Sequence, residues 1–282
     1  MGFMGLKSCE EVATKIKNQI KRGIENYLLN VEGATAPRLT IINTYPTEAS
    51  RAYTRGKIRD CEEVGIEVKL IETDTTVPIK IQDLILEEAE NTDGIIVQLP
   101  LHPELGIFKE EILSMIPYQL DVDGLRKKSP YLPATPRGIY EHLLSNEIPL
   151  RGKSVVVYGR SGIVGKPFAQ FAAERDATVV ICHSKTLREL ALKHLEHADI
   201  VICATGTELF TDVELAERLK SDAIVYDVGI RRTPEGLKGD ITHTGVHGMN
   251  ITPVPGGVGL LTRAGLLLNV YSSWLDVEKM YG

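Results

Sequence analysis

The sequence predicts an α/β fold in which parallel strands alternate with helices. Short apolar runs rich in Val and Ile alternate along the chain with longer amphipathic stretches. Chains with this alternation form parallel sheets joined by right-handed crossovers. With 282 residues, 43% of them hydrophobic, the chain can form two α/β domains or one large domain with a substantial core.

The first third of the chain is expected to form its own α/β unit. A helix begins near the capping-box pair Ser8 and Glu11, and apolar residues then recur at every fourth position from Val12 to Leu28. The following strands are predicted at 38–42, 67–71 and 94–98, and the following helices at about 47–64 and 79–90.

A second unit is expected beyond a border segment at 118–138, which is rich in Pro, Asp, Gly and Lys and has the composition of a functional loop. A helix is predicted to begin near Thr135, with Pro136 in its first turn. The remaining expected elements are a strand from Val155, strands at 178–182, 200–204 and 223–227, a hairpin-like turn at 236–239 and a final helix from about Leu261.

A Gly/Ser-rich loop follows the strand that begins at Val155. Glycines at 159, 162 and 165 allow a tight turn and a close approach of the backbone to a ligand, and the next helix offers free N–H groups to an anion. The spacing G-x-S-G-x-x-G departs from the usual dinucleotide fingerprint, so an ordinary strand–turn–helix is the alternative. We interpret the loop as a site for dinucleotide phosphates.

The next strand indicates which dinucleotide binds. About 20 residues beyond such glycines, NAD enzymes place an acid on the ribose, but this strand ends in His183, Ser184 and Lys185. Ser184 and Lys185, together with Arg160, are donors suited to a 2′-phosphate. The sequence therefore predicts NADP, the alternative being that the basic side chains are solvated loop charges.

Composition and charge exclude several classes of protein. A net charge of −6 without a basic stretch gives no reason to expect nucleic-acid binding. No apolar run approaches the ~20 residues of a membrane span, and the start lacks the pattern of a signal peptide, so we expect a cytoplasmic protein with no membrane partner.

The cysteines and histidines predict neither a disulfide framework nor a metal site. Cysteines 9, 61, 182 and 203 lack zinc or disulfide spacing, and the last two are expected to be core thiols. The histidine pairs 194/197 and 243/247 have ligand-like spacing, but no third ligand type converges on them in the sequence, so no metal is expected.

Three short patterns in the first unit carry side chains suited to catalysis. Tyr53 and Lys57 lie four residues apart on a predicted helix, where a desolvated lysine can act as a base, although an exposed pair has the same spacing. Gln98 ends a strand and would project from the carboxyl edge of the sheet. Asp121 and Asp123 precede a glycine, which is typical of a plain turn or of a cation site.

Seven short tracts stand in a fixed order along nearly the whole chain: Tyr53–Lys57, Val97–Leu101, Asp121–Gly124, Thr135–Gly138, Gly159–Pro167, Cys182–Thr186 and Pro253–Gly259. In this order they resemble the tracts of the bifunctional methylenetetrahydrofolate dehydrogenase/methenyltetrahydrofolate cyclohydrolase family, the FolD family. The last tract is close to diagnostic of that family.

This resemblance implies oxidation of 5,10-methylenetetrahydrofolate with NADP, hydrolysis of the methenyl product to 10-formyltetrahydrofolate in the same cleft, and a homodimer. It implies a catalytic domain at 1–138, a Rossmann-type NADP-binding domain at 139–252 and a C-terminal segment at 253–282 whose helix returns to the catalytic domain. By resemblance, Lys57 is catalytic, Tyr53 positions the substrate, Gln98 tunes Lys57 and Asp123 binds the pterin.

Further binding residues follow from the same resemblance. The implied substrate-binding set is Tyr53, Gln98, Leu99, Pro100, Asp123, Pro255, Gly256 and Gly257. The implied cofactor-binding set is Gly159, Arg160, Ser161, Gly162, Ile163, Val164, Gly165, His183, Ser184, Lys185, Thr205, Gly206, Gly229 and Ile230.

The chain departs from the family pattern at a few positions: Asn43 and Thr44, Ala134, Leu260 and Leu261, and a loop at 125–133 that looks shorter than usual. None of these removes a catalytic residue, but those after Gly259 bear on the balance of the two activities. Two alternatives are a shikimate-type NADP dehydrogenase and a non-catalytic NADP-binding regulator. The joint presence of Lys57, Gln98 and Asp123 argues against both.

Overall fold

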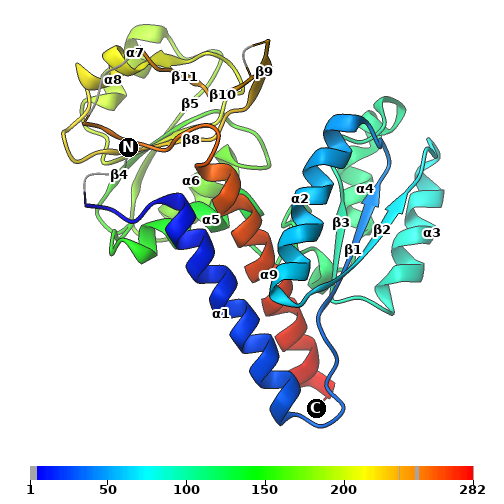
Figure 1. The fold of residues 1–282 in the computed structure, drawn as a ribbon. Coiled ribbons are helices and arrows are strands. Elements are labelled where there is room, and N and C mark those ends of the chain that lie inside the picture. Colours follow the sequence, from blue (N-terminus) through cyan, green and yellow to red (C-terminus); the bar gives the residue numbers. More distant parts are fainter. Residues whose placement is uncertain (1–4, 235, 245–247, 282) are drawn as a thin grey trace. The chain divides into compact units, whose positions relative to one another are not determined.

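The computed structural model describes residues 5–234, 236–244 and 248–281 of the chain (Figure 1). Its internal contacts divide the chain into two compact units, which we call the N-terminal unit (Thr14–Ala134 with Arg263–Gly282) and the C-terminal unit (Met1–Ala13 with Thr135–Thr262). Each unit contains a parallel sheet with helices, so the predicted α/β class is confirmed. The domain bounds proposed from the sequence stay a prediction.

The sheet of the N-terminal unit has the order β2-β1-β3, all parallel, with β1 at Arg38–Asn43, β2 at Glu67–Glu72 and β3 at Gly94–Val97. The chain passes from the central strand β1 to β2 on one side of it, and then crosses over β1 to β3 on the other side. Right-handed crossovers therefore place α2 (Glu48–Val64) and α3 (Pro78–Ala89) on opposite faces (Figure 1). The strand order reverses between β1 and β3, and ligands bind at the carboxyl ends of such strands.

The ends of α2 are fixed by capping residues next to the helix in the sequence. Thr47 caps α2 by accepting a hydrogen bond from the Ser50 N–H at 3.2 Å, and Gly65 ends the helix with φ of 88°. Two helical segments that the sequence did not predict, η1 (Pro103–Phe108) and α4 (Lys109–Met115), are followed by η2 (Tyr118–Leu120). Their apolar side chains pack under β3.

The first and last long helices are α1 (Cys9–Asn30) and α9 (Val258–Tyr281). The capping box is confirmed, because Ser8 and Glu11 exchange hydrogen bonds of 2.6 and 3.1 Å. The predicted apolar stripe is buried as far as Ile24, whereas Leu28 is 38% exposed. In the N-terminal unit, the rings of Tyr27 and Trp274 join α1 to α9 at 4.8 Å.

The α9 helix also contacts the loops of the N-terminal unit. Asn269 Nδ2 donates to the carbonyls of Val122 and Leu132, both at 2.9 Å. This helix begins three residues before the predicted start at Leu261, because the turn residues Gly256 and Gly257 lead directly into its first turn.

The main sheet of the C-terminal unit has five parallel strands in the order β12-β8-β6-β4-β5. Valine and isoleucine fill its centre, and Cys182 and Cys203 are buried core thiols as predicted. Its strands are β4 (Ser154–Tyr158), β5 (Thr178–Cys182), β6 (Ile200–Cys203), β8 (Ile224–Asp227) and β12 (Asn250–Ile251). Its helices are α5 (Ala134–Ser145), α6 (Gly165–Ala173), α7 (Arg188–Leu195) and α8 (Asp212–Ala216).

Two small strand pairs complete this unit. A parallel pair joins β7 (Phe210–Thr211) to β11 (Ile241–Thr242), and an antiparallel hairpin joins β9 (Arg231–Thr233) to β10 (Gly236–Lys238). The predicted turn at 236–239 is therefore wrong in detail, since its first three residues form the second strand of the hairpin. The main strand order reverses between β4 and β6, which makes their carboxyl ends the expected ligand-binding edge.

Candidate active site

Lys57 and Tyr53 lie one turn apart on α2 and contact each other. The Lys57 ammonium sits 5.2 Å from the centre of the Tyr53 ring, a cation–π distance. Lys57 is 4% exposed and Tyr53 is 43% exposed. The salt bridges of the described residues do not include Lys57. The alternative of a solvated pair is therefore wrong for the lysine, whose stem is buried.

Gln98 follows β3 at the point where the strand order reverses. It is 5% exposed, its Nε2 donates to the Leu99 carbonyl at 2.6 Å, and its Oε1 is buried without a donor in the described structure. A buried acceptor left unmet costs about 1–3 kcal/mol, so a donor from a ligand would be favoured there. The described residues show no hydrogen bond between Gln98 and Lys57, and the tuning role stays a prediction. Leu99 and Pro100 follow, joined by a cis peptide bond.

Two further buried polar atoms near this edge lack partners among the described residues: Asn43 Nδ2 and Thr54 Oγ1. Asn43 ends β1, beside Gln98, and its Oδ1 accepts hydrogen bonds from Tyr45 N at 3.2 Å and Ser50 Oγ at 3.1 Å. The sequence marked Asn43 only as a departure from a family pattern. Its burial at the carboxyl edge of the sheet makes it part of the candidate site.

The two carboxylates of the 121–124 turn have different surroundings. Asp121 is fully buried and accepts hydrogen bonds from the Leu125 and Arg126 N–H groups at 3.2 and 3.0 Å. Burial raises the pKa of Asp121, and these hydrogen bonds oppose that change. Asp123 is half-buried and forms no hydrogen bond with a described residue. Asp121 shapes the loop, and the carboxylate that can meet a ligand is Asp123.

The glycines of the Gly159–Gly165 loop have different structural roles. Gly159 has φ of 108°, and a Cβ there would lie 2.2 Å from the Ala204 carbonyl oxygen at the end of β6. A Cβ on Gly165 would lie 2.2 Å from the Gly159 carbonyl oxygen, whereas one on Gly162 would meet nothing within 4 Å. The outer glycines permit close packing, and the middle one leaves open space for a ligand.

Other residues of this loop prepare the start of α6. Ser161 Oγ accepts a hydrogen bond from Val164 N at 3.2 Å. Ile163 is half-buried and Val164 is buried, so they hold the loop to the unit. The exposed Arg160 side chain forms no hydrogen bond or ion pair within the described chain.

The turn after β5 presents further donors. Ser184 and Lys185 are exposed, and their side chains bind no other described residue. The turn itself is ordered, because His183 Nδ1 accepts from Lys185 N at 3.2 Å and Thr186 Oγ1 accepts from His183 N at 3.0 Å. Its side chains can therefore meet an anion without first breaking a contact.

A buried carboxylate that the sequence reading missed holds the turn after β6. Asp240 Oδ2 accepts hydrogen bonds from Thr205 N at 2.6 Å, Thr205 Oγ1 at 2.7 Å and Gly206 N at 3.3 Å. A Cβ on Gly229, in the turn after β8, would lie 1.7 Å from Asp240 Oδ1. Asp240 thus packs between two turns of the predicted cofactor site. Ile230, next to Gly229, is 58% exposed.

Asp227 supports Asp240 from the end of β8. Its carboxylate accepts hydrogen bonds from Asp240 N at 2.8 Å and Ile241 N at 3.1 Å, and its own N–H donates to Thr252 Oγ1 at 2.8 Å. Burial raises the pKa of Asp227 to about 7. The sequence feature that could have revealed Asp227 is its place as the charged last residue of the otherwise apolar strand β8.

The segment before α9 turns tightly. The Val254–Pro255 peptide is cis, Gly256 has φ of 94°, and a Cβ on Gly257 would lie 2.2 Å from the Pro253 carbonyl oxygen. Pro255 and Gly256 are exposed, so their backbone can approach a ligand.

The histidine pairs show no metal-like arrangement in the described chain. His194 is half-buried and His197 is exposed, while His243 lies 4.0 Å from Asp212, and His247 lies outside the described residues. Over the described ranges, no group of three or more His, Cys, Asp or Glu side chains gathers as metal ligands would. In the same ranges no helix has both the length and the apolar composition to cross a membrane.

Comparison with known proteins covers both units. The family model "Tetrahydrofolate dehydrogenase/cyclohydrolase, catalytic domain" matches residues 8–123, and the model for the NAD(P)-binding domain of the same family matches residues 133–277. The Bifunctional protein FolD of Salinibacter ruber is 37% identical, with 92% of each chain covered. That of Bacillus subtilis is 36% identical, with 94% of this chain and 95% of the relative covered.

Solved structures of the same family are similar to this chain over nearly its whole length. The bifunctional FolD enzyme of Campylobacter jejuni has a TM-score of 0.83 and 31% identity, with 96% of this chain and 98% of that chain covered. The Trypanosoma brucei dehydrogenase-cyclohydrolase, complexed with NADP cofactor and inhibitor, has a TM-score of 0.86 and 28% identity, with 99% of this chain and 100% of that chain covered. The chain belongs to the tetrahydrofolate dehydrogenase/cyclohydrolase family, the family of the bifunctional FolD proteins.

Proposed function

We propose that this enzyme oxidises 5,10-methylenetetrahydrofolate to the methenyl form with NADP and hydrolyses the methenyl product to 10-formyltetrahydrofolate. The observation that carries the proposal is the match of both family domains to a chain in which Lys57 is buried on α2 without a salt bridge among the described residues. A shikimate-type dehydrogenase and a non-catalytic regulator are not favoured by this match.

The side chains of the N-terminal unit suit a pterin and its one-carbon bridge. A pterin presents adjacent N–H donors, and the Asp123 carboxylate can accept two of them. The unmet Oε1 of Gln98 and the exposed ring of Tyr53 supply an acceptor and a flat apolar surface. We assign substrate binding to these three residues together with Leu99, Pro100 and the segment Pro255–Gly257.

The C-terminal unit fits NADP. The open space at Gly162 admits a pyrophosphate to the start of α6, and the Thr205–Gly206 and Gly229–Ile230 turns lie at the same edge of the sheet. Arg160, Ser184 and Lys185 supply the donors for a 2′-phosphate. When bound, NADP supplies the hydride acceptor for the dehydrogenase reaction.

Lys57 is assigned to the second reaction. Attack of water on the methenyl carbon requires that a proton be removed from water and delivered again, and a lysine side chain beside the substrate can move that proton. Hydride departure needs no such transfer, because the nitrogen lone pair already assists it. The two reactions therefore share a substrate site and differ in their dependence on Lys57.

One assay tests the proposed function. Purified protein is mixed with methylenetetrahydrofolate and NADP, and the absorbances of NADPH and methenyltetrahydrofolate are followed together. Formation of NADPH with transient or little methenyl product is expected. Absence of NADPH would refute the dehydrogenase activity and favour either the shikimate-type enzyme or the silent regulator.

We also propose that the enzyme is a cytoplasmic homodimer. The four cysteines are free and buried, which suits a reducing compartment, and the dimer rests on family resemblance. Light scattering at micromolar concentration is expected to give twice the chain mass of 31.1 kDa, and a monomer mass would refute the dimer.

A further inference from the structure

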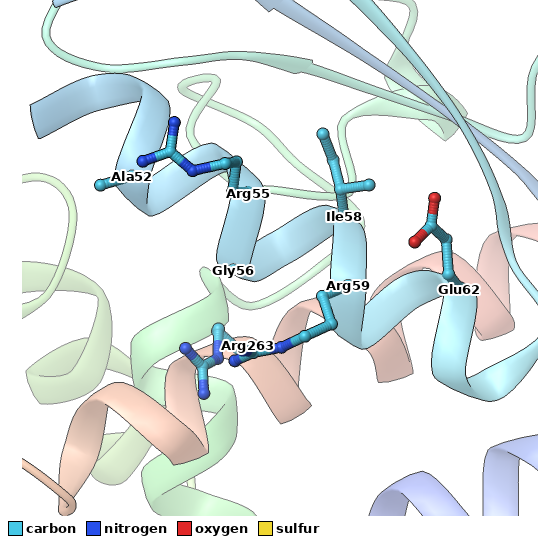
Figure 2. Close-up of a pocket in the computed structure, with 7 residues that line it drawn as sticks. All are labelled: Ala52, Arg55, Gly56, Ile58, Arg59, Glu62 and Arg263. Carbon is cyan, nitrogen blue, oxygen red and sulfur yellow. The ribbon is translucent and has the colours of Figure 1, made fainter. Parts of the chain in front are cut away.

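The buried face of α2 carries three polar side chains in a row. Ser50, Thr54 and Lys57 are separated by four and three residues, which places them along one side of the helix, and all three are buried. With 3.6 residues per turn, Arg55 and Arg59 fall on the other side of α2, where they line a pocket of about 550 Å³ (Figure 2). That pocket is lined by Ala52, Arg55, Gly56, Ile58, Arg59, Glu62 and Arg263.

Asn43 reaches the buried face of α2 from the end of β1. Its Oδ1 accepts hydrogen bonds from the Ser50 hydroxyl at 3.1 Å and from the Tyr45 N–H at 3.2 Å. A backbone N–H can only donate, so the oxygen of the amide is the atom that faces Tyr45 and the nitrogen is the other branch. Asn43 Nδ2 is thus a fully buried donor with no acceptor among the described residues.

Thr54 carries a second buried atom of this kind. A threonine inside a helix can donate its hydroxyl to the carbonyl four residues earlier. The Thr54 side chain is 1% exposed, yet its Oγ1 forms no hydrogen bond within the described part of the chain. Because buried hydroxyls in folded proteins have hydrogen-bond partners, this atom is suited to a bound water or ligand.

One water molecule can meet both atoms. Asn43 Nδ2 needs an acceptor, the Thr54 hydroxyl can donate or accept, and water does both. Asn43 is hydrogen-bonded to Ser50, and the Cβ atoms of residues four apart on a helix, such as Ser50 and Thr54, are separated by about 5–6 Å. Two hydrogen bonds of about 2.8 Å through one water cover that span.

The neighbours of these two residues are the groups that hydrolysis uses. Gln98 N donates to the Ile42 carbonyl at 2.8 Å, so Gln98 and Asn43 follow paired residues of β3 and β1 and lie side by side. Gln98 is assigned to the substrate. Thr54 lies about one turn before Lys57, which is assigned to the proton of hydrolysis. A water between Asn43 and Thr54 therefore lies close to both.

We propose that Asn43 and Thr54 hold the water that attacks the methenyl carbon, a proposal that rests on the proposed function. The oxygen of this water forms a bond to the methenyl carbon, and one of its protons leaves by way of Lys57. The bond from that carbon to N5 then breaks and its electron pair returns to N5, which takes up a proton while the new hydroxyl loses its own to become the formyl carbonyl. Hydride transfer consumes no water, so the two residues should matter to hydrolysis alone.

Thr54→Val tests the proposal, because it removes the hydroxyl and keeps the shape of the side chain. Hydrolysis is measured directly on methenyltetrahydrofolate, and dehydrogenation on methylenetetrahydrofolate with NADP. The kcat of hydrolysis should fall about three- to tenfold, the size of one lost hydrogen bond, while kcat and KM of dehydrogenation stay unchanged. The Tm should not fall, since the hydroxyl has no partner to lose among the described residues. Thr54→Ser, which keeps the hydroxyl, should restore hydrolysis.

A double variant and a control sharpen the test. Asn43→Ala should also lower hydrolysis, and adding Thr54→Val to it should cause little further loss, because both changes affect the same water. Arg55→Gln, which changes an exposed residue on the other side of α2, should keep the wild-type ratio of the two activities.

Three results would overturn the proposal. A parallel loss of both activities in Thr54→Val would show that Thr54 contacts the substrate. Unaltered hydrolysis in Thr54→Val would show that its hydroxyl holds no reacting water, and losses that multiply in the double variant would show that Asn43 and Thr54 act separately. A wild-type enzyme that hydrolyses no methenyltetrahydrofolate would instead refute the proposed function.

Discussion

Asp240 Oδ2 accepts hydrogen bonds from both the backbone N–H and the hydroxyl of Thr205, at 2.6 and 2.7 Å. A single fully buried carboxylate thereby fixes the conformation of the turn after β6, which we assign to the cofactor site. Asp240 is not itself assigned to cofactor binding and acts through Thr205 and Gly206, which are, so it is a positioning residue. Its effect on NADP should therefore pass through Thr205 and Gly206.

Replacing Asp240 should weaken NADP binding. Asp240→Ala removes the acceptor shared by the Thr205 and Gly206 N–H groups, so the turn loses the contacts that fix it, whereas Asp240→Asn keeps one acceptor oxygen. The dissociation constant of NADP, measured by calorimetry on folded protein, should rise more in the alanine variant than in the asparagine variant. Asp222→Ala, which removes an exposed carboxylate from the same unit, is the control. Wild-type affinity in a folded Asp240→Ala protein would disprove the positioning role.

The buried Asp227 predicts a pH dependence of stability. Its pKa is raised from 3.8 to about 7 in the folded protein, so the folded state binds the proton more tightly than the unfolded state. Its contribution to stability is complete below about pH 4 and is lost as the pH rises towards 7, by up to about 1.4 kcal/mol per pH unit. Above pH 8 the contribution of Asp227 to the free energy of unfolding should no longer change with pH.

Denaturant unfolding of wild type and Asp227→Asn between pH 4 and 8 measures this contribution. The free energy of unfolding of wild type should fall relative to that of Asp227→Asn as the pH rises from 4 to 7, since the amide does not titrate. Two parallel curves would show that Asp227 keeps an ordinary pKa.

Arg160 should discriminate between the two dinucleotides. A charged hydrogen bond to the 2′-phosphate contributes roughly 1.5–3 kcal/mol, so Arg160→Ala should weaken NADP at least about tenfold and leave NAD nearly unchanged. Dissociation constants for both cofactors test this, with Lys193→Ala, which removes an exposed lysine from α7 of the same unit, as control. An equal loss of affinity for NADP and for NAD would show that Arg160 does not bind the 2′-phosphate.

The parts of the fold that the sequence predicted are those with strong local patterns. The continuous apolar run of β4 and the four-residue repeat of α1 specify their elements without tertiary information. The segment of η1 and α4 has weak periodicity and becomes helical through packing of Leu105, Ile112 and Leu113 under β3. Local propensity therefore does not predict it.

Site residues could be predicted from the sequence where a polar residue or a glycine lies in the turn that follows a predicted strand. Gln98 stands directly after β3 and Gly162 lies in the loop that follows β4, where parallel sheets bind ligands. The burial of Lys57 was not predictable, because Tyr53–Lys57 spacing is the same on a solvated helix. Asp240 was missed because its partner Thr205 lies 35 positions away in the chain, and no local pattern joins the two.

The central claim is that Lys57 acts on the proton of hydrolysis and not on the hydride. Lys57→Gln should lower cyclohydrolase activity by the ~10²–10⁴ typical of lost acid–base catalysis. Dehydrogenase activity should fall less, by the contribution of Lys57 to positioning. Asp123→Ala is the contrasting variant, because a carboxylate that binds the pterin serves both reactions and its loss should depress both together.

The most direct measurement follows the absorbances of NADPH and methenyltetrahydrofolate in one cuvette after Lys57→Gln enzyme meets methylenetetrahydrofolate and NADP. We predict continued NADPH formation with accumulation of released methenyltetrahydrofolate. A parallel decline of the two activities, or hydrolysis that survives intact, would contradict the assignment of Lys57 to the hydrolytic step.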